Sequence, residues 1–373
     1  MKINLRPVTD RHPPAKGRQV RAFLCIRNEA QRLPFILSYY RQAGVAWFFV
    51  IDNCSTDGST EFLRAQPDCT VFTTADSYAA ANYGMDWVNA LLEEHGIGHW
   101  RLFVDADEIL VYPHVEDLDL PEFCDYLSGR DCDGIYAFML DMYAAASVAN
   151  THYNPGEDFL DASPLFDTNY EFRNRLRRPG GSAPFPPLEV VGGPRLRRLY
   201  PEFLGKGRLQ YAIPRGLTKL RNSRLGRALH VERWLKDTSS PPLLSKVPLT
   251  FGRTGFVYVS SHKTVPLRLS PVTGTLLHFK FFDDFHARVA AALAEGQHFD
   301  GGSEYARYAQ ALETDPTFSL KYEGSVPYVG SDDLVARGLL RNDPSYDVFW
   351  AERKERRHAS AIPDRAEALA AIL

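Results

Sequence analysis

Short apolar runs alternate with amphipathic segments through the first 145 residues. The runs predict buried strands at residues 20–26, 47–51, 69–73, 101–104 and 133–142. Between them, apolar side chains recur at helical spacing, as in Leu33, Ile36, Leu37 and Tyr40, which predicts helices at residues 33–43, 76–94 and 120–127 and a short one around Phe62. This alternation predicts an α/β fold, a mostly parallel sheet flanked by helices on both faces.

The pattern weakens after Tyr143. Residues 150–200 are rich in glycine and proline, and apolar strands return only near residues 256–260 and 275–279. A helix is expected at residues 282–293 and an amphipathic one at residues 360–373. We therefore expect three parts, namely a sheet domain of residues 1–145, a loop-rich part of residues 146–330 that completes the site, and a helical tail of residues 331–373.

Composition narrows the classes of protein. The 373 residues carry a net charge of −3, which gives no basic footprint for nucleic acid. Five cysteines without a C-x-x-C spacing favour a reducing compartment over a disulfide framework or a zinc site. No apolar run is long enough to cross a bilayer, and the first twenty residues lack the apolar block of a signal peptide. The expected location is the cytoplasm.

Polar residues follow three of the predicted strands. They are Arg27-Asn28-Glu29, Asp52-Asn53 and Asp105-Ala-Asp107-Glu108. Adjacent parallel strands would bring these loops to one rim of the sheet, where open α/β sheets bind ligands. Paired carboxylates there suit a divalent cation such as magnesium. Two residues also have local interpretations, because Asn28 suits a helix N-cap and Asp52 suits a turn as well as a base or ribose contact.

Four blocks in this order carry a resemblance to a known family. They are Cys25-Ile-Arg-Asn-Glu29, Ile51-Asp-Asn-Cys-Ser-Thr-Asp-Gly-Ser-Thr60, Ala81-Asn-Tyr-Gly84 and Val104-Asp-Ala-Asp-Glu108. Over roughly residues 20–145 the chain resembles the GT-A (Rossmann-like) glycosyltransferases of the family-2 type, in the branch that shares features with family 92. The resemblance implies a nucleotide-sugar donor, most often a uridine diphosphate sugar, and Mn²⁺ or Mg²⁺.

The resemblance also implies roles for single residues. Asp52 would contact uracil, Arg27 and Glu29 would line the nucleoside pocket, and Asn82 would face the donor near its diphosphate. Asp105 would approach the ribose or the metal, and Asp107 would ligate the metal. Asn53, also expected at the donor, stands where many relatives have a second Asp, which leaves the base open. A late histidine, His278 or His262, would be a third metal ligand; otherwise His278 is a core residue.

An inverting transfer also needs a carboxylate base near the anomeric carbon. We expect Glu189 in this role, with Asp141, Glu157 and Asp158 as alternatives. Lys246 and Lys280 would reach the diphosphate unless they are solvated. The arginines at 173–178 and 195–198 would grip an acceptor phosphate or an anionic membrane surface, or would lie in solvated loops.

The resemblance thus implies a metal-dependent, inverting glycosyltransferase with a glycan or lipid-linked acceptor, acting in surface polysaccharide synthesis. Peripheral contact at the inner face of the membrane is expected through the arginine groups. A nucleotidyltransferase is the alternative, but it would need a glycine-rich loop after the first strand. A catalytically silent nucleotide-binding protein is another. Because Asp105 and Glu108 would repel Asp107, replacing Asp107 by Asn is expected to keep or raise stability without metal.

Overall fold

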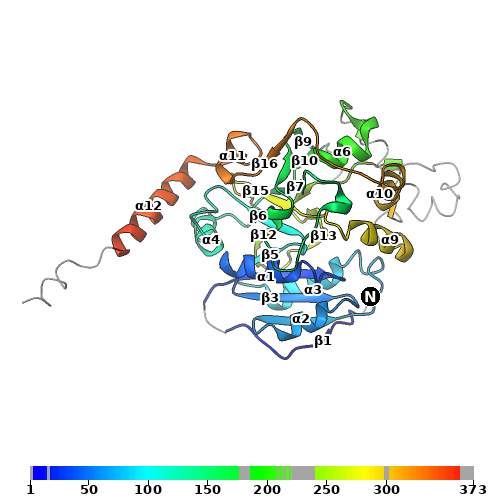
Figure 1. Cartoon of the computed structure of the whole chain (residues 1–373). Helices are drawn as coiled ribbons and strands as arrows, with labels where there is room; N and C mark the ends of the chain where they lie inside the picture. Colours follow the sequence, from blue (N-terminus) through cyan, green and yellow to red (C-terminus); the bar gives the residue numbers. More distant parts are fainter. Residues whose placement is uncertain are drawn as a thin grey trace, which may run out of the picture.

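The computed structural model describes residues 3–14, 17–175, 185–207, 210, 211, 213, 216, 217, 220, 240–297 and 302–361. Two mixed β-sheets form the centre of this part of the chain, and helices pack against them (Figure 1). In that view the blue strands of the first sheet, such as β1 and β3, lie below the green and yellow strands of the second, such as β7 and β15. The predicted α/β class, with a loop-rich second half, is confirmed.

The first sheet has the strand order β1-β4-β3-β2-β5-β12. Its four central strands are parallel, whereas β1 and β12 pair antiparallel at the two edges. In that order the strands are β1 (Arg6–Pro7), β4 (Cys69–Thr73), β3 (Trp47–Asp52), β2 (Val20–Ile26), β5 (Trp100–Phe103) and β12 (Leu249–Phe251). Each predicted strand of this sheet is present within one residue of its expected ends.

Helices cover both faces of the first sheet because successive strand residues point to opposite sides. On β2, Phe23 packs with Trp87 on one face, whereas Leu24 belongs to the main core with Ile36 on the other. The helices involved are α1 (Leu33–Gln42), α2 (Ser59–Ala65) and α3 (Met85–His95). The expected two-sided arrangement is therefore observed.

The strand order reverses beside β2. The chain runs from β2 through β3 to β4 in one direction and then places β5 on the other side of β2. Open α/β sheets bind ligands near such a reversal, at the carboxyl ends of the strands. Here the loop after β2, at Arg27–Glu29, and the loop after β5, at Asp105–Asp107, follow the two strands at the reversal, and we call the region between these loops the crevice.

The second sheet has the order β16-β8-β7-β15-β6, with β11 also paired to β7. Its strands are β16 (Ser325–Pro327), β8 (Leu165–Asp167), β7 (Ala137–Tyr143), β15 (Gly274–His278), β6 (Glu108–Val111) and β11 (Ser245–Lys246). The strand predicted at 133–142 thus begins at Ala137 and belongs to this sheet rather than the first. Strands from beyond residue 145 complete both sheets, so the expected three-part division stays a prediction.

The remaining elements belong to neither of these two sheets. They are α4 (Leu120–Gly129), α5 (Phe159–Ala162), β9 (Tyr170–Asn174), β10 (Leu188–Gly192), α6 (Gly193–Leu199), β13 (Tyr258–Ser260), β14 (Lys263–Thr264), α9 (Phe285–Glu295), α10 (Ser303–Thr314), α11 (Ser331–Ala336) and α12 (Pro344–Ala361). Helix α12 projects from the body (Figure 1). In the part of the chain that the structure describes, every helix is too short or too polar to span a membrane.

Two local predictions differ from the structure, and a third lies mostly outside the described residues. Asn28 is not an N-cap, because it has φ 56° and α1 begins only at Leu33. The helix expected from residue 76 begins at Met85, because Asn82 and Tyr83 have positive φ values of 51° and 55° that interrupt a right-handed helix. Of the amphipathic tail expected at 360–373, residues 362–373 lie outside the described residues.

Two ion pairs fasten the loop after β2 to α9. Arg32, with a fully buried side chain, donates to both carboxylate oxygens of Asp284 at 2.7 and 2.9 Å. Arg288 donates to both oxygens of Glu29 at 2.8 Å. A buried guanidinium without a carboxylate is costly, so these pairs hold α9 against the first sheet.

Asp284→Ala should therefore destabilise the protein. It leaves Arg32 with only the more distant Glu29, at 3.7 Å. Removing one partner of a buried pair costs about 3–5 kcal/mol of folding free energy. Here the expected loss is roughly 2–3 kcal/mol, because Glu29 still lies near Arg32 and because Asp284 is part-exposed. Urea denaturation measures the change. Asp125→Ala, which breaks the exposed pair with Arg353, is the control and should cost at most about 1 kcal/mol. Equal losses would contradict this account of α9.

Candidate functional site

The loops after β2 and β3 form one hydrogen-bonded unit. The amide of Glu29 donates to Ser59 Oγ at 2.9 Å, and the amide of Ala30 donates to Asp57 Oδ2 at 2.9 Å. In return, Asn28 Oδ1 accepts from the amide of Thr56 at 2.8 Å. The two loops therefore present a fixed rim beside the crevice, as the adjacent parallel strands predicted.

Asp52 and Asn53 are buried in the turn that follows β3. Asp52 accepts from the amide of Ser55 at 2.9 Å and from the hydroxyl of Thr60. Asn53 Nδ2 donates to the carbonyl oxygens of Thr74 and Asp76 at 2.9 and 3.2 Å. These bonds show that both residues shape the turn; contact with a base stays a prediction.

Asp105 faces a buried lysine. Lys246 Nζ on β11 lies 2.8 Å from Asp105 Oδ2 and 2.5 Å from Glu108 Oε1. Burial opposes the charge on Lys246, but Asp105 and Glu108 outweigh it and raise the lysine pKa above its usual value. Lys246 is thus a fixed cation at the crevice, held by carboxylates rather than solvated, and the side chain of Asp105 remains 45% exposed.

His278 lies between two carboxylates because β15 is inserted between β6 and β7. In register it stands opposite Glu108 on β6 and Asp141 on β7. Its Nδ1 is 2.7 Å from Asp141 Oδ1, and its Nε2 is 3.6 Å from Asp107 Oδ2. A carboxylate at Nδ1 orients the ring, so the Nε2 atom of His278 faces Asp107.

Asp141 is fully buried, and both of its oxygens are engaged. Besides His278, it accepts from Arg195 Nε at 2.7 Å, and Arg195 Nη1 lies 3.2 Å from Glu304 Oε1. Burial opposes ionisation, but Arg195 and His278 outweigh it and lower the pKa of Asp141. This geometry suits a residue that positions His278 better than a base that takes a proton from an acceptor.

Cations surround Asp107. Burial disfavours its charge, but His278, Arg288, Arg32 and Lys280 outweigh burial and lower the pKa of Asp107 to about 2. The 3.6 Å separation from His278 is too long for a hydrogen bond, so the two groups do not satisfy each other. A carboxylate and an imidazole nitrogen held in this way are both ligands for a divalent transition ion.

A complete protein-only metal site is not present in the described residues, where no three His, Cys, Asp or Glu side chains gather as metal ligands. The side chains of Asp107 and His278 lie next to each other, whereas Asp105 forms an ion pair with Lys246. The donor set therefore fits an ion held by few protein ligands that takes its others from substrate phosphates and water, as magnesium sites do.

The other predicted donor residues lie around this cluster. Arg27 Nη2 is 2.8 Å from Glu295 Oε1 on α9, and Asn82 Nδ2 donates to the carbonyl of Val259 at 3.2 Å. His262 Nδ1 is 3.1 Å from the carbonyl of Ser245, and burial and nearby Lys246 lower the pKa of His262 to about 3. His262 is therefore neutral at physiological pH. Lys280 lies 3.8 Å from Glu304.

The predicted bases are dispersed. Glu189 lies on β10, opposite Arg173 on β9. Asp158 caps α5 by accepting from the amide of Leu160, and Glu157 is exposed. A catalytic role for Glu189 stays a prediction.

The arginine groups do not form the expected basic surface. Arg195 and Arg173 are buried, and Arg197 pairs with the buried carboxylate of Asp167 at 3.0 Å. Arg177 and Arg178 lie outside the described residues. Interior carboxylates hold Arg195 and Arg197, so these two guanidinium groups are not free to bind an anionic membrane surface.

Sequence reasoning missed Arg32, Arg288 and the link from Arg195 to Asp141. The sequence pattern predicts a helix at residues 282–293 and assigns no partner to its charged side chains. Arg32 and Asp284 are 252 residues apart, and no local spacing indicates that pairing. The pairing depends on how α9 packs.

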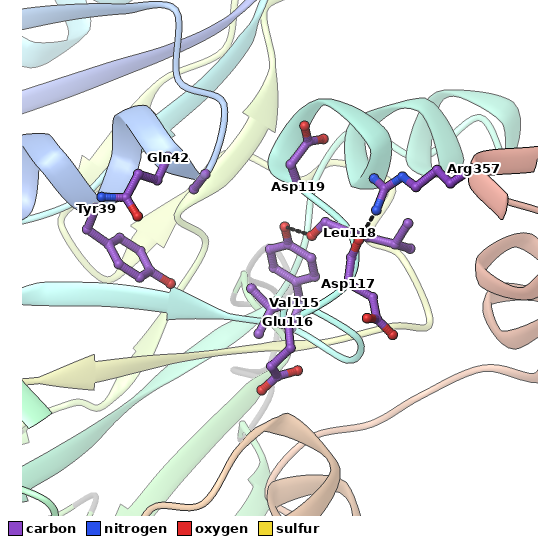
Figure 2. Close-up of a pocket in the computed structure, with 10 residues that line it drawn as sticks. Tyr39, Gln42, Val115, Glu116, Asp117, Leu118, Asp119 and Arg357 are labelled. Carbon is purple, nitrogen blue, oxygen red and sulfur yellow. Dashed lines mark hydrogen bonds between the residues drawn. The ribbon is translucent and has the colours of Figure 1, made fainter. Parts of the chain in front are cut away.

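A cavity of about 320 Å³ lies at the other end of β6 from Asp107 (Figure 2). Tyr39, Glu116, Asp117 and Arg357 are among the residues that line it. Glu116 caps α11 through the amide and hydroxyl of Ser331, and Arg357 donates to the carbonyl of Asp117. Since its acidic groups serve these contacts, this cavity is separate from the cluster around Asp107.

No protein-family model matches the chain, and no curated protein matches its sequence. The solved structures with weak similarity to this chain include the following two. The mannosyltransferase PcManGT from Pyrobaculum calidifontis, in complex with GDP-Man and Mn²⁺, is 20% identical over 35% of this chain and 38% of its own, with a TM-score of 0.25. A protein assigned as a glucose-1-phosphate thymidylyltransferase from Bacillus anthracis, in complex with a sucrose, is 10% identical over 37% of this chain and 65% of its own, with a TM-score of 0.22. The chain spans less than two thirds of each, and these similarities are too weak to support an assignment.

The surroundings of Asp107 reverse the stability change expected from sequence. Asp107→Asn should lower the free energy of unfolding without metal by about 2 kcal/mol at neutral pH, because the pKa falls from 3.8 to about 2 and one unit is worth about 1.4 kcal/mol. The pKa of Asp107 is lower in the folded protein than in the unfolded chain, so its ionised carboxylate contributes stability above pH 3.8. This contribution is lost as the pH falls through about 2.

Denaturation of parent and Asp107→Asn across this pH range measures the difference, which should shrink toward zero in acid. A variant that is as stable as the parent at pH 7 would show that carboxylate repulsion dominates after all.

Proposed function

We propose that the protein is a metal-dependent glycosyltransferase that uses a nucleotide-sugar donor, with a uridine diphosphate sugar as the first choice. The observation that carries this proposal is the pair of Asp107, which follows β5, and His278, whose Oδ2 and Nε2 atoms lie 3.6 Å apart while Asp141 orients the imidazole. Three of the four blocks that resemble GT-A enzymes follow the parallel strands β2, β3 and β5, which supports the proposal.

Asp107 and His278 would hold the divalent ion, which would neutralise the charge that develops on the leaving diphosphate. The protein contributes fixed cations as well. Lys246 is held by Asp105 and Glu108, and Arg288 is held by Glu29 close to Asp107. Charges fixed before the reaction need no reorganisation during it, which is the larger part of electrostatic catalysis.

The loop after β2 separates this proposal from nucleotidyl transfer. Its residues Arg27, Asn28 and Glu29 contain no glycine, and Glu29 is locked by Arg288. Such a loop cannot wrap its backbone closely around a triphosphate. A glycosyltransferase releases a nucleoside diphosphate, whereas a nucleotidyltransferase releases pyrophosphate, so product analysis separates the two.

The finer features of the proposal rest on the family resemblance. They are inversion at the anomeric carbon, a glycan or lipid-linked acceptor, surface polysaccharide synthesis and action in the cytoplasm at the inner face of the membrane. Glu189 is the proposed base. Asp141, fully buried behind His278, would position that ligand.

Uridine diphosphate should raise the melting temperature only with Mn²⁺ present, because the ion joins the diphosphate to Asp107. At a hundredfold excess over the dissociation constant the stabilisation is about 2.7 kcal/mol. Thermal melts with Mn²⁺ or with chelator measure it.

In Asp107→Asn this shift should disappear, whereas Asp117→Asn, which changes a carboxylate at the other end of β6, should keep it. A parallel melt with guanosine diphosphate tests which nucleobase the site prefers. Equal shifts in Mn²⁺ and in chelator would contradict the metal-bridged site.

Glu189→Gln should bind donor like the parent but turn over roughly 10²–10⁴-fold more slowly, since glutamine cannot accept a proton. Release of nucleoside diphosphate with acceptor present measures turnover, and calorimetry measures donor binding. Glu157→Gln is the matched control and should keep normal turnover. Near-normal turnover in Glu189→Gln would remove Glu189 from the reaction.

A further inference from the structure

A second cavity, of about 450 Å³, lies between the β9–β10 hairpin, α6 and the segment after Phe203. That volume is within the range of small-molecule sites in proteins. Its lining includes the cations Arg173 and Lys206, the carboxylate Glu171, the aromatic Tyr211 and the apolar Val191 and Leu196. This mixture of an apolar wall and a few charged groups is typical of a binding site for a polar ligand.

Arg173 is the unusual member of this lining. It is only 6% exposed, and its Nη2 contacts Glu171 Oε2 at 2.5 Å and the carbonyl of Lys206 at 3.1 Å. Its Nε and Nη1 are buried without a hydrogen-bond partner among the described residues. Its guanidinium lies 4.8 Å from the centre of the Tyr211 ring, which helps to fix its plane. Unsatisfied buried donors on a charged group are costly, so they indicate a missing acceptor.

The cavity shares its walls with the candidate site. On β10, Glu189 and Val191 point to the same side of the hairpin, because side chains alternate along a strand. Arg173 stands opposite Glu189 across the hairpin. The next element, α6, sends Arg195 to Asp141 and lines the cavity with Leu196. The proposed base and the cavity therefore lie on one face of one hairpin.

We infer that this cavity binds a phosphate group of the acceptor, held by Arg173 and Lys206. Phosphate supplies strong acceptors for guanidinium N–H donors, and the two cations exceed the single carboxylate of Glu171. Naming the ligand as the acceptor rests on the proposed function; the anion site itself does not. The phosphate belongs either to a soluble sugar phosphate or to a lipid headgroup.

Calorimetric titration of the full chain with a hexose 1-phosphate tests the soluble form. Flotation with phosphatidylcholine vesicles, with and without phosphatidic acid, tests the lipid form.

Arg173→Met should weaken binding of whichever ligand binds by about tenfold or more. Lys206→Gln should weaken this binding less, because the side chain of Lys206 is exposed. Arg198→Gln removes a neighbouring charge that does not line the cavity and should bind like the parent. Melting curves confirm folding, and Lys206→Gln carries the test if Arg173→Met does not fold.

Binding should be the same in Mn²⁺ and in chelator and should persist in Asp107→Asn, because the cavity is not the metal site. No binding of either probe, or equal binding by the parent, Arg173→Met and Lys206→Gln, would overturn the inference. Competition by uridine diphosphate would also overturn it, since the ligand would then occupy the donor crevice. If the parent protein bound the phosphate probe but did not bind uridine diphosphate in the presence of Mn²⁺, only the proposed function would be contradicted.

Discussion

Buried carboxylates at the junction of the two sheets each need a cation, and the rest of the structure is arranged to supply one. Arg288 serves Glu29, Lys246 serves Glu108, and Arg195 serves Asp141. An uncompensated charge in such a place would cost several kcal/mol. Each of these cations comes from the second half of the chain, so the acidic loops of the first sheet depend on residues far away in sequence.

Asp107 differs from these paired carboxylates in a way that bears on function. Its surroundings favour the ionised form, yet the nearest ring nitrogen of His278 is 3.6 Å away, because Asp141 holds the imidazole from its other side. The protein thus maintains a charged carboxylate and a directed imidazole nitrogen without letting them pair. Such preorganisation is what a divalent ion and a diphosphate would exploit, because the ligands need no rearrangement on binding.

The hairpin β9–β10 and α6 connect this cluster to the cavity around Arg173. One side of that assembly fixes Asp141 through Arg195, and the other forms the cavity wall. Donor and acceptor groups bound on two sides of a rigid assembly would be oriented relative to each other, and orientation is a major part of catalysis of group transfer. The arginines that sequence reasoning took for one basic surface therefore have separate positions and separate partners.

The first sheet could be predicted from sequence because its signals are local. Apolar runs, helical spacing and turn residues specified β2 to β5 and the polar loops at their carboxyl ends, and parallel neighbours necessarily share one rim. The local sequence pattern also singled out His278, Glu189 and the arginines as candidate site residues, but it did not indicate which residues they contact. Only the tertiary structure decided that β15 lies between β6 and β7, that Asp105 turns to Lys246, and that Arg173 is buried beside a cavity. Those contacts join residues more than 30 and up to about 250 positions apart, where the choice of partner depends on how whole elements pack rather than on any spacing along the chain.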